Sequence, residues 1–395
     1  MEIKPFDKRI YLASPTMHGE EQMFVKEAFD TNWVSTVGAN LNELEKEVSK
    51  LIGVEGAVAL ASGTSALHLA LRLSGVKPGD IVFGQSMTFD ASVNPIKYEY
   101  CTPVFVDSET DTWNMNPVAL RKAFDKYPEC KAVITVNLYG VPCKLDEIRE
   151  ICDEHGAVLI EDAAESLGAS YKGKMTGSFG DYNAISFNGN KIITTSGGGM
   201  LLTDDLSAAD KARKWSTQAR DNAPWYQHSE LGYNYRLSNI LAGIGRGQLI
   251  HLKEHIERKK EIYERYKKGL KDLPVRMNPY LECSEPIFWL SCIEILPEGM
   301  CKQVRNDFDY SYEKEAGRSC PEMIREELLR YNVESRPIWK PMHLQPIYKD
   351  YDYIKAGDND VCADIFDRGL CLPSDIKMTD REQDIIIEII KGCFN

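Results

Sequence analysis

Long apolar runs are absent from this sequence of 395 residues, in which no stretch of about 18 consecutive apolar residues occurs. Charged side chains stand at positions 2, 4, 7, 8 and 9, where a secretory signal would begin to build its apolar core. We therefore expect a soluble, cytoplasmic chain that does not associate with a membrane.

Basic residues are too few for a surface that binds polyanions. The 47 Lys and Arg residues against 60 Asp and Glu residues give a net charge of −13. Because nucleic acid and anionic lipid are both attracted by a positive field, we expect neither as a partner. A ligand that carries phosphate must then be held by a local site.

Cys-x-x-Cys pairs are also absent, although the chain has 11 cysteines. Cys143 and Cys152, for example, are nine residues apart, which is not the spacing of a zinc site or a redox motif. We interpret the cysteines as reduced, small apolar residues and predict no metal site. Internal repeats and low-complexity tracts are missing as well.

Between residues 54 and 203, short β-rich runs alternate with helical stretches. This alternation is typical of βαβ units that build a mainly parallel sheet. The predicted strands are 57–61, 81–85, 103–106, 132–137, 158–161, 183–187 and 200–203, and helices are predicted over 64–74 and 144–155. Open sheets of this class bind ligands at the carboxyl ends of their strands, so chemistry is expected there.

A charged helix over 251–271 separates this region from the rest of the chain. We predict an N-terminal arm and large domain over 1–250 and a small C-terminal α/β domain over 251–395. The second region has a predicted strand over 288–295, a polar segment over 297–319, a helix over 321–331 and a closing amphipathic helix from residue 380.

Two phosphate-binding motifs are present only in part. Residues 168–174 have the GxxxxGK spacing of a P-loop, but Met175 stands where a magnesium-binding hydroxyl is needed, and we predict a surface hairpin. Gly243, Gly245 and Gly247 approximate a dinucleotide fingerprint, but no strand precedes them and the third glycine comes one residue early. Small residues on a tightly packed helix are the better interpretation.

Three strand ends carry side chains that suit one cofactor. Residues 62–65, Ser-Gly-Thr-Ser, lie where a strand turns into a helix, so their N–H groups and hydroxyls favour an anion. Asp162 ends a buried strand and either caps a helix or faces a cationic ring nitrogen. Lys191 follows another strand, and together these groups suggest a Schiff base with pyridoxal 5'-phosphate.

The motifs as a set resemble the DegT/DnrJ/EryC1/StrS family of nucleotide-sugar aminotransferases. The resemblance runs from about residue 10 to residue 374 and is carried by Ser-Gly-Thr-Ser-Ala-Leu at 62–67, Glu-Asp-Ala-Ala-Glu at 161–165, Ser-Phe-Asn-Gly-Asn-Lys at 186–191, Gly-Tyr-Asn-Tyr-Arg-Leu-Ser at 232–238 and Arg-Pro-Ile-Trp-Lys-Pro-Met-His at 336–343. Residues 188–200 look most like the subgroup that aminates C4 of a UDP-4-keto-6-deoxy-N-acetylhexosamine on the route to bacillosamine.

The resemblance implies the type I fold of pyridoxal phosphate-dependent transferases, as in aspartate aminotransferase, and a homodimer with shared active sites. It also implies that Lys191 forms the covalent link to the cofactor. The resemblance assigns the phosphate to Gly63, Thr64, Ser65 and Ser186, with Asn234 reaching it from the partner subunit. It assigns the cofactor ring to Phe89, Ala164, Asp162 and Glu165, and the nucleotide sugar to Arg336, Trp339 and His343.

The implied reaction moves an amino group from L-glutamate to the C4 ketone of a UDP-linked 2-acetamido-4-keto-2,6-dideoxyhexose, for polysaccharide biosynthesis. A GDP- or dTDP-linked substrate, or amination at C3, is the nearest alternative. A family dehydratase is disfavoured, because those relatives carry His where Lys191 stands. A non-catalytic sugar-nucleotide-binding or scaffold protein is disfavoured by the complete set of Lys191, Asp162 and Ser186. The polar segment 297–319 and His18 depart from the family pattern.

Overall fold

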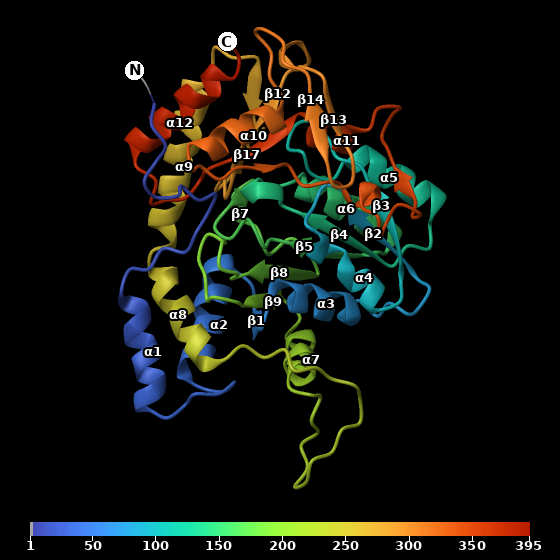
Figure 1. Cartoon of the computed structure of the whole chain (residues 1–395). Coiled ribbons are helices and arrows are strands. Elements are labelled where there is room, and N and C mark those ends of the chain that lie inside the picture. Colours follow the sequence, from blue (N-terminus) through green and yellow to red (C-terminus); the bar gives the residue numbers. More distant parts are fainter. Residues whose placement is uncertain (1–2) are drawn as a thin grey trace.

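The computed structural model describes residues 3–395, and an eight-stranded mixed sheet forms its centre (Figure 1). All strands but β9 run parallel to one another. Their spatial order is β1 (Gly56–Leu60), β9 (Gly199–Thr203), β8 (Tyr182–Ser186), β5 (Val158–Asp162), β4 (Ala132–Val136), β2 (Ile81–Gln85), β3 (Thr102–Val106) and β16 (Tyr353–Ile354). The first seven confirm the predicted strands, each boundary to within one residue.

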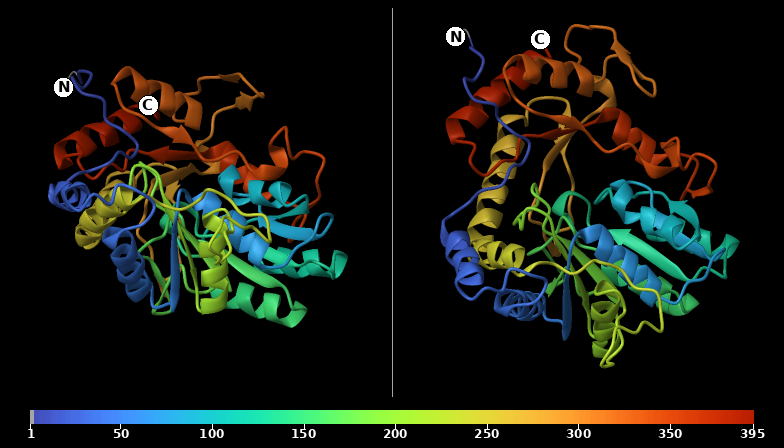
Figure 2. Two further views of the ribbon diagram at one scale, coloured as in Figure 1. Left: turned by 90° about the horizontal axis from the view of Figure 1, so that it is seen from below. Right: turned by 60° about the horizontal axis from the view of Figure 1, so that its bottom comes forward.

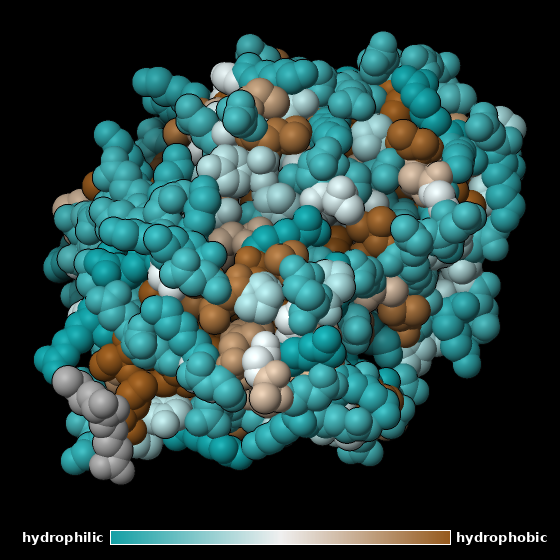
Figure 3. All heavy atoms as spheres, turned by 90° about the horizontal axis from the view of Figure 1, so that it is seen from above, coloured by the Kyte–Doolittle hydropathy of each residue, from teal (hydrophilic) through white to brown (hydrophobic). Residues whose placement is uncertain are grey.

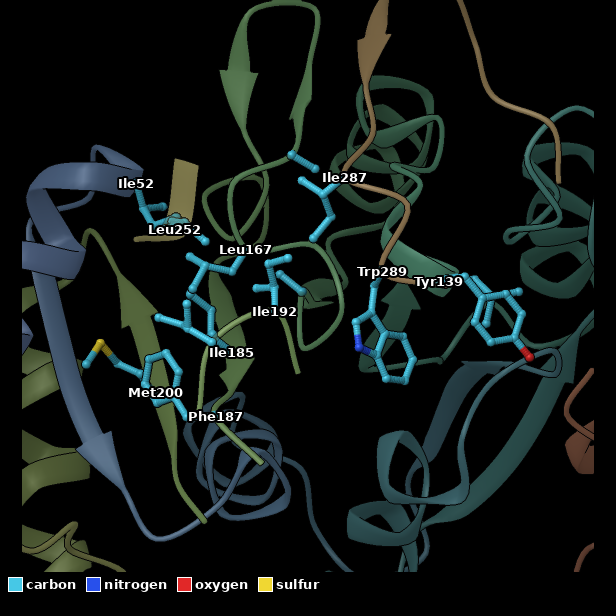
Figure 4. Packing of buried hydrophobic residues seen from close by; sticks show 14 of the residues in the cluster. Ile52, Tyr139, Leu167, Ile185, Phe187, Ile192, Met200, Leu252, Ile287 and Trp289 are labelled. Atoms are coloured by element: carbon cyan, nitrogen blue, oxygen red, sulfur yellow. The ribbon is translucent and has the colours of Figure 1, made fainter. Parts of the chain in front are cut away.

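Helices cover both faces of this sheet, which is why its strands are almost continuously apolar. One face packs against α3 (Gly63–Leu73), α4 (Asn94–Tyr98) and α7 (Leu206–Ser216). The other face packs against α2 (Ala39–Ile52) and α8 (Asn239–Ile250) at one end and against α5 (Pro117–Lys126) and α6 (Leu145–His155) at the other. Figure 4 shows part of the second face, where Ile52 and Leu252 gather with Leu167 and Ile185.

The long helix α9 (Leu252–Gly269) leads into a smaller antiparallel sheet that has its own apolar cluster. The strands of this sheet, in order, are β10 (Val275–Met277), β12 (Ser291–Ile295), β17 (Gly369–Leu372) and β15 (Arg336–Pro337). The helices of this region are α10 (Pro321–Arg330), α11 (Val361–Arg368) and α12 (Asp380–Gly392). The helix over 321–331 and the closing helix are therefore confirmed, and the predicted strand over 288–295 is present but begins at Ser291.

Segments distant in the sequence connect the region of the large sheet to the rest of the chain. The late strand β16 pairs with β3 of the large sheet, and β11 (Ser284–Glu285) pairs with β6 (Ser170–Tyr171). At the N-terminus, Ile10 forms a bridge with Val333, and both views in Figure 2 place the two termini on the side of α12. The domain boundary near residue 250 stays a prediction.

The two incomplete phosphate motifs have the structures that we expect. Residues 170–175 form a hairpin of β6 and β7 (Lys174–Met175). The glycines of α8 pack against α1 (Glu20–Asp30), where a Cβ at Gly247 would come within 2.5 Å of the backbone N of Glu21. The interpretation as a packed helix is thereby confirmed.

The polar segment 297–319 forms a second hairpin, of β13 (Gln303–Arg305) and β14 (Tyr310–Tyr312). Short 3-10 turns complete the chain at Asp90–Ser92, Leu138–Gly140, Pro297–Gly299 and Met342–Leu344. Nine of the 11 cysteines are buried, whereas Cys283 is exposed and Cys393 is half-buried.

Hydrophilic residues dominate one side of the surface. The face seen from the side of α10 and α12 is mostly hydrophilic, with apolar patches between the hydrophilic residues (Figure 3). Among residues 3–395, no helix combines the length and the apolar character that crossing a bilayer requires.

Candidate active site

A pocket of about 840 Å³ lies at the carboxyl ends of β1, β5 and β8. Residues from β15 and the segment after it form part of its wall. Its lining includes most of the predicted site residues, namely Gly63, Thr64, Phe89, Asp162, Ala164, Glu165, Ser186, Lys191, Arg336 and Trp339. Topology brings them together, because parallel strands end at one edge of the sheet.

The turn between β1 and α3 forms one wall of the pocket. Ser62 caps α3: its Oγ accepts a hydrogen bond of 3.0 Å from the backbone N–H of Ser65 and lies 2.8 Å from the hydroxyl of Ser65. Gly63 is closely packed, since a Cβ there would lie 3.0 Å from the Cβ of Ser186. The free N–H groups and the positive end of this helix favour an anion.

Asp162 lies at the end of β5, where its carboxylate is buried. Its Oδ2 accepts a hydrogen bond of 2.7 Å from Ser92 Oγ, and its Oδ1 accepts one of 3.0 Å from the N–H of Ala164. Burial raises the pKa of Asp162, although both hydrogen bonds act in the opposite direction. Turns rather than a helix follow Asp162, so the helix-cap alternative is wrong.

Lys191 and Glu165 form an ion pair on the floor of the pocket. The Nζ of Lys191 lies 3.3 Å from Glu165 Oε1 and 4.2 Å from the ring centroid of Trp289. Glu165 Oε2 accepts a hydrogen bond of 2.7 Å from the N–H of Tyr139. Burial raises the pKa of Glu165 to about 7, while the charge of Lys191 acts to lower it.

Tyr139 shows that the backbone beneath Glu165 is strained. Its φ of 53° lies in the left-handed region, which is costly for a residue that carries a Cβ. Its phenolic oxygen accepts a hydrogen bond of 3.0 Å from the N–H of Trp339, and its ring is a neighbour of Trp289 (Figure 4). Tyr139 therefore connects the β4 end of the large sheet to the segment that follows β15.

Aromatic and cationic side chains stand at the opening of the pocket. Phe89 is 53% exposed, and its ring centroid is 5.6 Å from that of Trp339. The guanidinium of Arg336 is 3.0 Å from Glu334, and Lys340 is 3.3 Å from Asp307 of the β13–β14 hairpin. Because both cations are at the opening, they can meet an anionic ligand as it enters.

Three predicted residues do not line the pocket. Ser65 lies behind Ser62, while Asn234 is exposed in the segment between α7 and α8. His343 has both ring nitrogens engaged, since Nδ1 lies 2.7 Å from Ser86 Oγ and Nε2 lies 3.0 Å from Asp360 Oδ2. The structure thus does not bring His343 to the substrate opening.

Several lining or supporting residues escaped prediction, among them Ser92, Tyr139, Trp289 and Lys340. Trp289 precedes a strand instead of following one, so the strand-end rule gave no signal for it. Lys340 lies within the 336–343 motif and could have been selected as a second cation there.

The donor set fits pyridoxal phosphate. A lysine amine can join an aldehyde, a buried and hydrogen-bonded carboxylate can pair with a pyridine nitrogen, and a helix N-terminus with hydroxyls can hold a phosphate. Lys191, Asp162 and the turn at Ser62 supply these groups within one pocket.

The comparisons with known proteins agree on one protein family. Residues 15–391 match the DegT/DnrJ/EryC1/StrS aminotransferase family. EpsN of Bacillus subtilis (strain 168), named as a pyridoxal phosphate-dependent aminotransferase, is 47% identical over 98% of this chain and 96% of its own length. A GDP-perosamine synthase of Caulobacter vibrioides is 36% identical over 96% of each chain.

A solved structure agrees with these sequence matches. Spr1654 of Streptococcus pneumoniae, named as a sugar aminotransferase, superposes in its PLP form with a TM-score of 0.85 at 25% identity over 98% of both chains. The type I transferase fold and the use of pyridoxal phosphate are confirmed.

Proposed function

Because the chain belongs to the DegT/DnrJ/EryC1/StrS aminotransferase family, we propose that it transfers an amino group from L-glutamate to the C4 ketone of a UDP-2-acetamido-4-keto-2,6-dideoxyhexose. The observation that carries the proposal is the pocket in which Lys191, Glu165 and Asp162 lie together, with Arg336 at its opening. The UDP-sugar assignment is supported by the resemblance of residues 188–200 to the bacillosamine subgroup. The amino sugar would enter polysaccharide biosynthesis.

Different walls of the pocket would hold different parts of the cofactor. Gly63, Thr64 and Ser186 would hold the phosphate at the N-terminus of α3. Ser65, whose N–H donates to Ser62 Oγ, would support this turn from behind. Asp162 would bind the ring nitrogen, Glu165 the phenolic oxygen, and Phe89 and Ala164 the two ring faces. Pyridoxal phosphate, when bound, accepts an amino group from the donor and passes it to the ketone.

Asp162 acts as a fixed negative charge in this scheme. Ser92 and the N–H of Ala164 hold its carboxylate in one orientation, so it can keep a proton on a ring nitrogen placed against it. Because the carboxylate of Asp162 is buried, little water competes for it, and its negative charge would stay beside the ring nitrogen during the reaction.

Lys191 acts as the mobile base. Its Nζ faces Glu165 Oε1 and the Trp289 ring, so the amine has one charged partner and one aromatic wall. When the amine is free, it can take a proton from the reacting carbon and return one to the neighbouring atom. Glu165, held by the N–H of Tyr139, would keep the amine directed into the pocket.

A GDP-linked keto sugar is the second candidate substrate, favoured by the 36% identity to a GDP-perosamine synthase. The test is to incubate purified enzyme with L-glutamate and UDP-, GDP- or dTDP-4-keto-6-deoxy sugars, and to follow 2-oxoglutarate and the amino sugar by mass spectrometry. We expect kcat/KM to be at least ~10-fold higher with the UDP-N-acetyl sugar, equivalent to ~1.4 kcal/mol. Faster turnover of a GDP sugar would reassign the nucleotide.

A further inference from the structure

Three histidines from two distant parts of the chain meet beside α9. His18 lies in the N-terminal arm just before α1, whereas His251 and His255 stand one turn apart where α9 begins. The rings of His18 and His251 are stacked with their centroids 3.7 Å apart, and Nε2 of His18 lies 2.7 Å from Nε2 of His255. The fold thus brings three of the seven histidines of the chain together, outside the active-site pocket.

Residues 251–255 read His-Leu-Lys-Glu-His and place two of the three histidines and Glu254 at the start of α9. Side chains at positions i and i+3 lie on one face of a helix, so His251 and Glu254 can approach the same point. One ligand atom from each of His18, His251 and Glu254 lies within 4.8 Å of the other two. Imidazole nitrogens with a carboxylate oxygen are ligands that Zn²⁺ prefers.

Hydrogen bonding leaves one nitrogen of His18 free to bind a metal ion. The Nδ1 of His255 lies 2.8 Å from the carbonyl oxygen of Ile192, which can only accept, so His255 carries its proton on Nδ1. Nε2 of His255 must then accept the proton of His18 Nε2. The remaining nitrogen of His18, Nδ1, keeps its lone pair. Such a second hydrogen bond is the usual support of a metal-binding histidine.

His251 has similar support. Its Nε2 lies 3.2 Å from Glu20 Oε2, and its Nδ1 lies 3.2 Å from Glu254 Oε2. Glu20 can therefore accept the proton of one nitrogen, and the other nitrogen lies beside Glu254. Because the rings of His18 and His251 are nearly parallel, the ring of His251 must turn for its lone pair and that of His18 to meet at one ion. The carboxylate of Glu254 is 68% exposed, so an ion can enter from solvent and retain water as a further ligand.

We propose that His18, His251 and Glu254 bind a divalent transition metal ion, with Zn²⁺ as the expected ion, and that His255 orients His18. This departs from the prediction of no metal site, which rested on the spacing of cysteines alone. The ion would connect the N-terminal arm to α9. Through His18 and His255 it would also be connected to Ile192, the residue that follows Lys191. The proposal does not depend on which sugar the enzyme aminates.

The test is a titration of untagged, chelator-treated holoenzyme with ZnCl₂, followed by calorimetry and native mass spectrometry. We expect one Zn²⁺ per chain. His18→Ala should weaken the affinity at least ~100-fold, and His255→Ala, which removes only the supporting hydrogen bond, ~10- to 100-fold. Glu254→Gln should weaken it at least ~10-fold, and this variant keeps the test decisive if His18→Ala fails to fold, because the side chain is exposed.

Matched controls stand elsewhere on the surface. His155→Ala removes an exposed histidine from the end of α6, and Glu257→Gln removes an exposed carboxylate one turn further along α9. Both controls should bind Zn²⁺ as the wild type does. Equal affinity in the controls and in Glu254→Gln and His18→Ala, or no stoichiometric binding by the wild type, would overturn the proposal.

Discussion

At the scale of single residues, the pocket holds three charged groups where little water reaches them. Asp162 and Glu165 are each 4% exposed, and the side chain of Lys191 is 13% exposed. Two carboxylates in such a place cost free energy unless a cation faces them. These buried charged groups are therefore available to pair with charged groups of a bound ligand.

Lys191 is the first residue to test. Lys191→Ala removes the only amine that we assign to covalent attachment, so turnover should be lost. The variant should still bind pyridoxal phosphate without covalent attachment, because the turn at Ser62 is unchanged. Borohydride reduction and peptide mass spectrometry should find the cofactor on Lys191 in the wild type and nowhere in the variant. An active Lys191→Ala enzyme would contradict the proposed chemistry.

Asp162→Asn separates charge from hydrogen bonding. The amide oxygen can still accept from the N–H of Ala164, so the variant should fold with an unchanged melting temperature. Without the negative charge, turnover should fall at least ~100-fold, equivalent to ~2.7 kcal/mol of barrier. Steady-state kinetics beside a melting curve checks both parts. Normal kcat in a stable variant would show that the charge is not used.

Glu165 should make the stability of cofactor-free protein depend on pH. Its pKa is raised from 4.5 to about 7, so the folded state binds a proton that the unfolded state has already released. This group therefore lowers the free energy of unfolding as the pH rises from about 4.5 to about 7, by up to ~3 kcal/mol. Urea denaturation of wild type and Glu165→Gln at several pH values measures the difference. Parallel curves would show that the pKa is not raised.

At the scale of elements, α1 and α8 pack closely through the glycines of α8. Gly247→Ala would place a Cβ within 2.5 Å of the backbone of Glu21, so the two helices must separate. We expect a loss of about 1 to 3 kcal/mol, measured by thermal unfolding. The matched control is Gly392→Ala at the end of α12, where a Cβ meets nothing within 4 Å and should have little effect. Equal melting temperatures would contradict the packing argument.

The strands of the large sheet could be predicted from sequence because each is a short apolar run between turn residues. Helix α2 could also have been predicted, since Leu41, Leu44 and Val48 follow helical spacing and are buried. Helix α1 could not be predicted, because its apolar residues do not lie on one buried face. Met23 and Phe29, for example, are exposed to solvent in the single chain.

The candidate site could be predicted from sequence where its residues lie at strand ends. Asp162 and Lys191 follow strands that the sequence reveals, and the family motif adds Glu165. Ser92 and Trp289 reach the pocket only through the tertiary fold, so no local pattern selects them. His343 shows a related limit of local patterns: the sequence shows that it is polar, and only the structure shows that both of its ring nitrogens have hydrogen-bond partners.

At the scale of the whole molecule, exposed aromatic residues favour a homodimer. Phe29 is 61% exposed, Trp33 53%, Trp225 66% and Tyr226 81%. Because large exposed aromatic groups gain free energy when a second subunit covers them, we propose the homodimer that the family resemblance implies. The segment between α7 and α8, which holds Trp225, Tyr226 and Asn234, extends away from the body in Figure 1, where it can reach a second subunit.

Shared active sites can be tested by complementation. Lys191→Ala and Asn234→Asp should each be inactive, the second because a carboxylate repels the cofactor phosphate. If Asn234 serves the partner's site, a heterodimer of the two carries both lesions in one site and none in the other. Activity should then return to at most about half that of the wild-type dimer. Proven heterodimers without activity would show that Asn234 serves its own chain.

The edge strand β16 also fixes the order in which the molecule can be completed. The outer edge of β3 is paired only when Tyr353 and Ile354 have been synthesised. At typical rates of translation the ribosome needs about 12 to 50 s to reach them after β3 emerges. During that time the nascent chain carries an unpaired apolar strand edge, a template for association with other chains. Ribosomes that stop before residue 353 would release a protein with that edge permanently open.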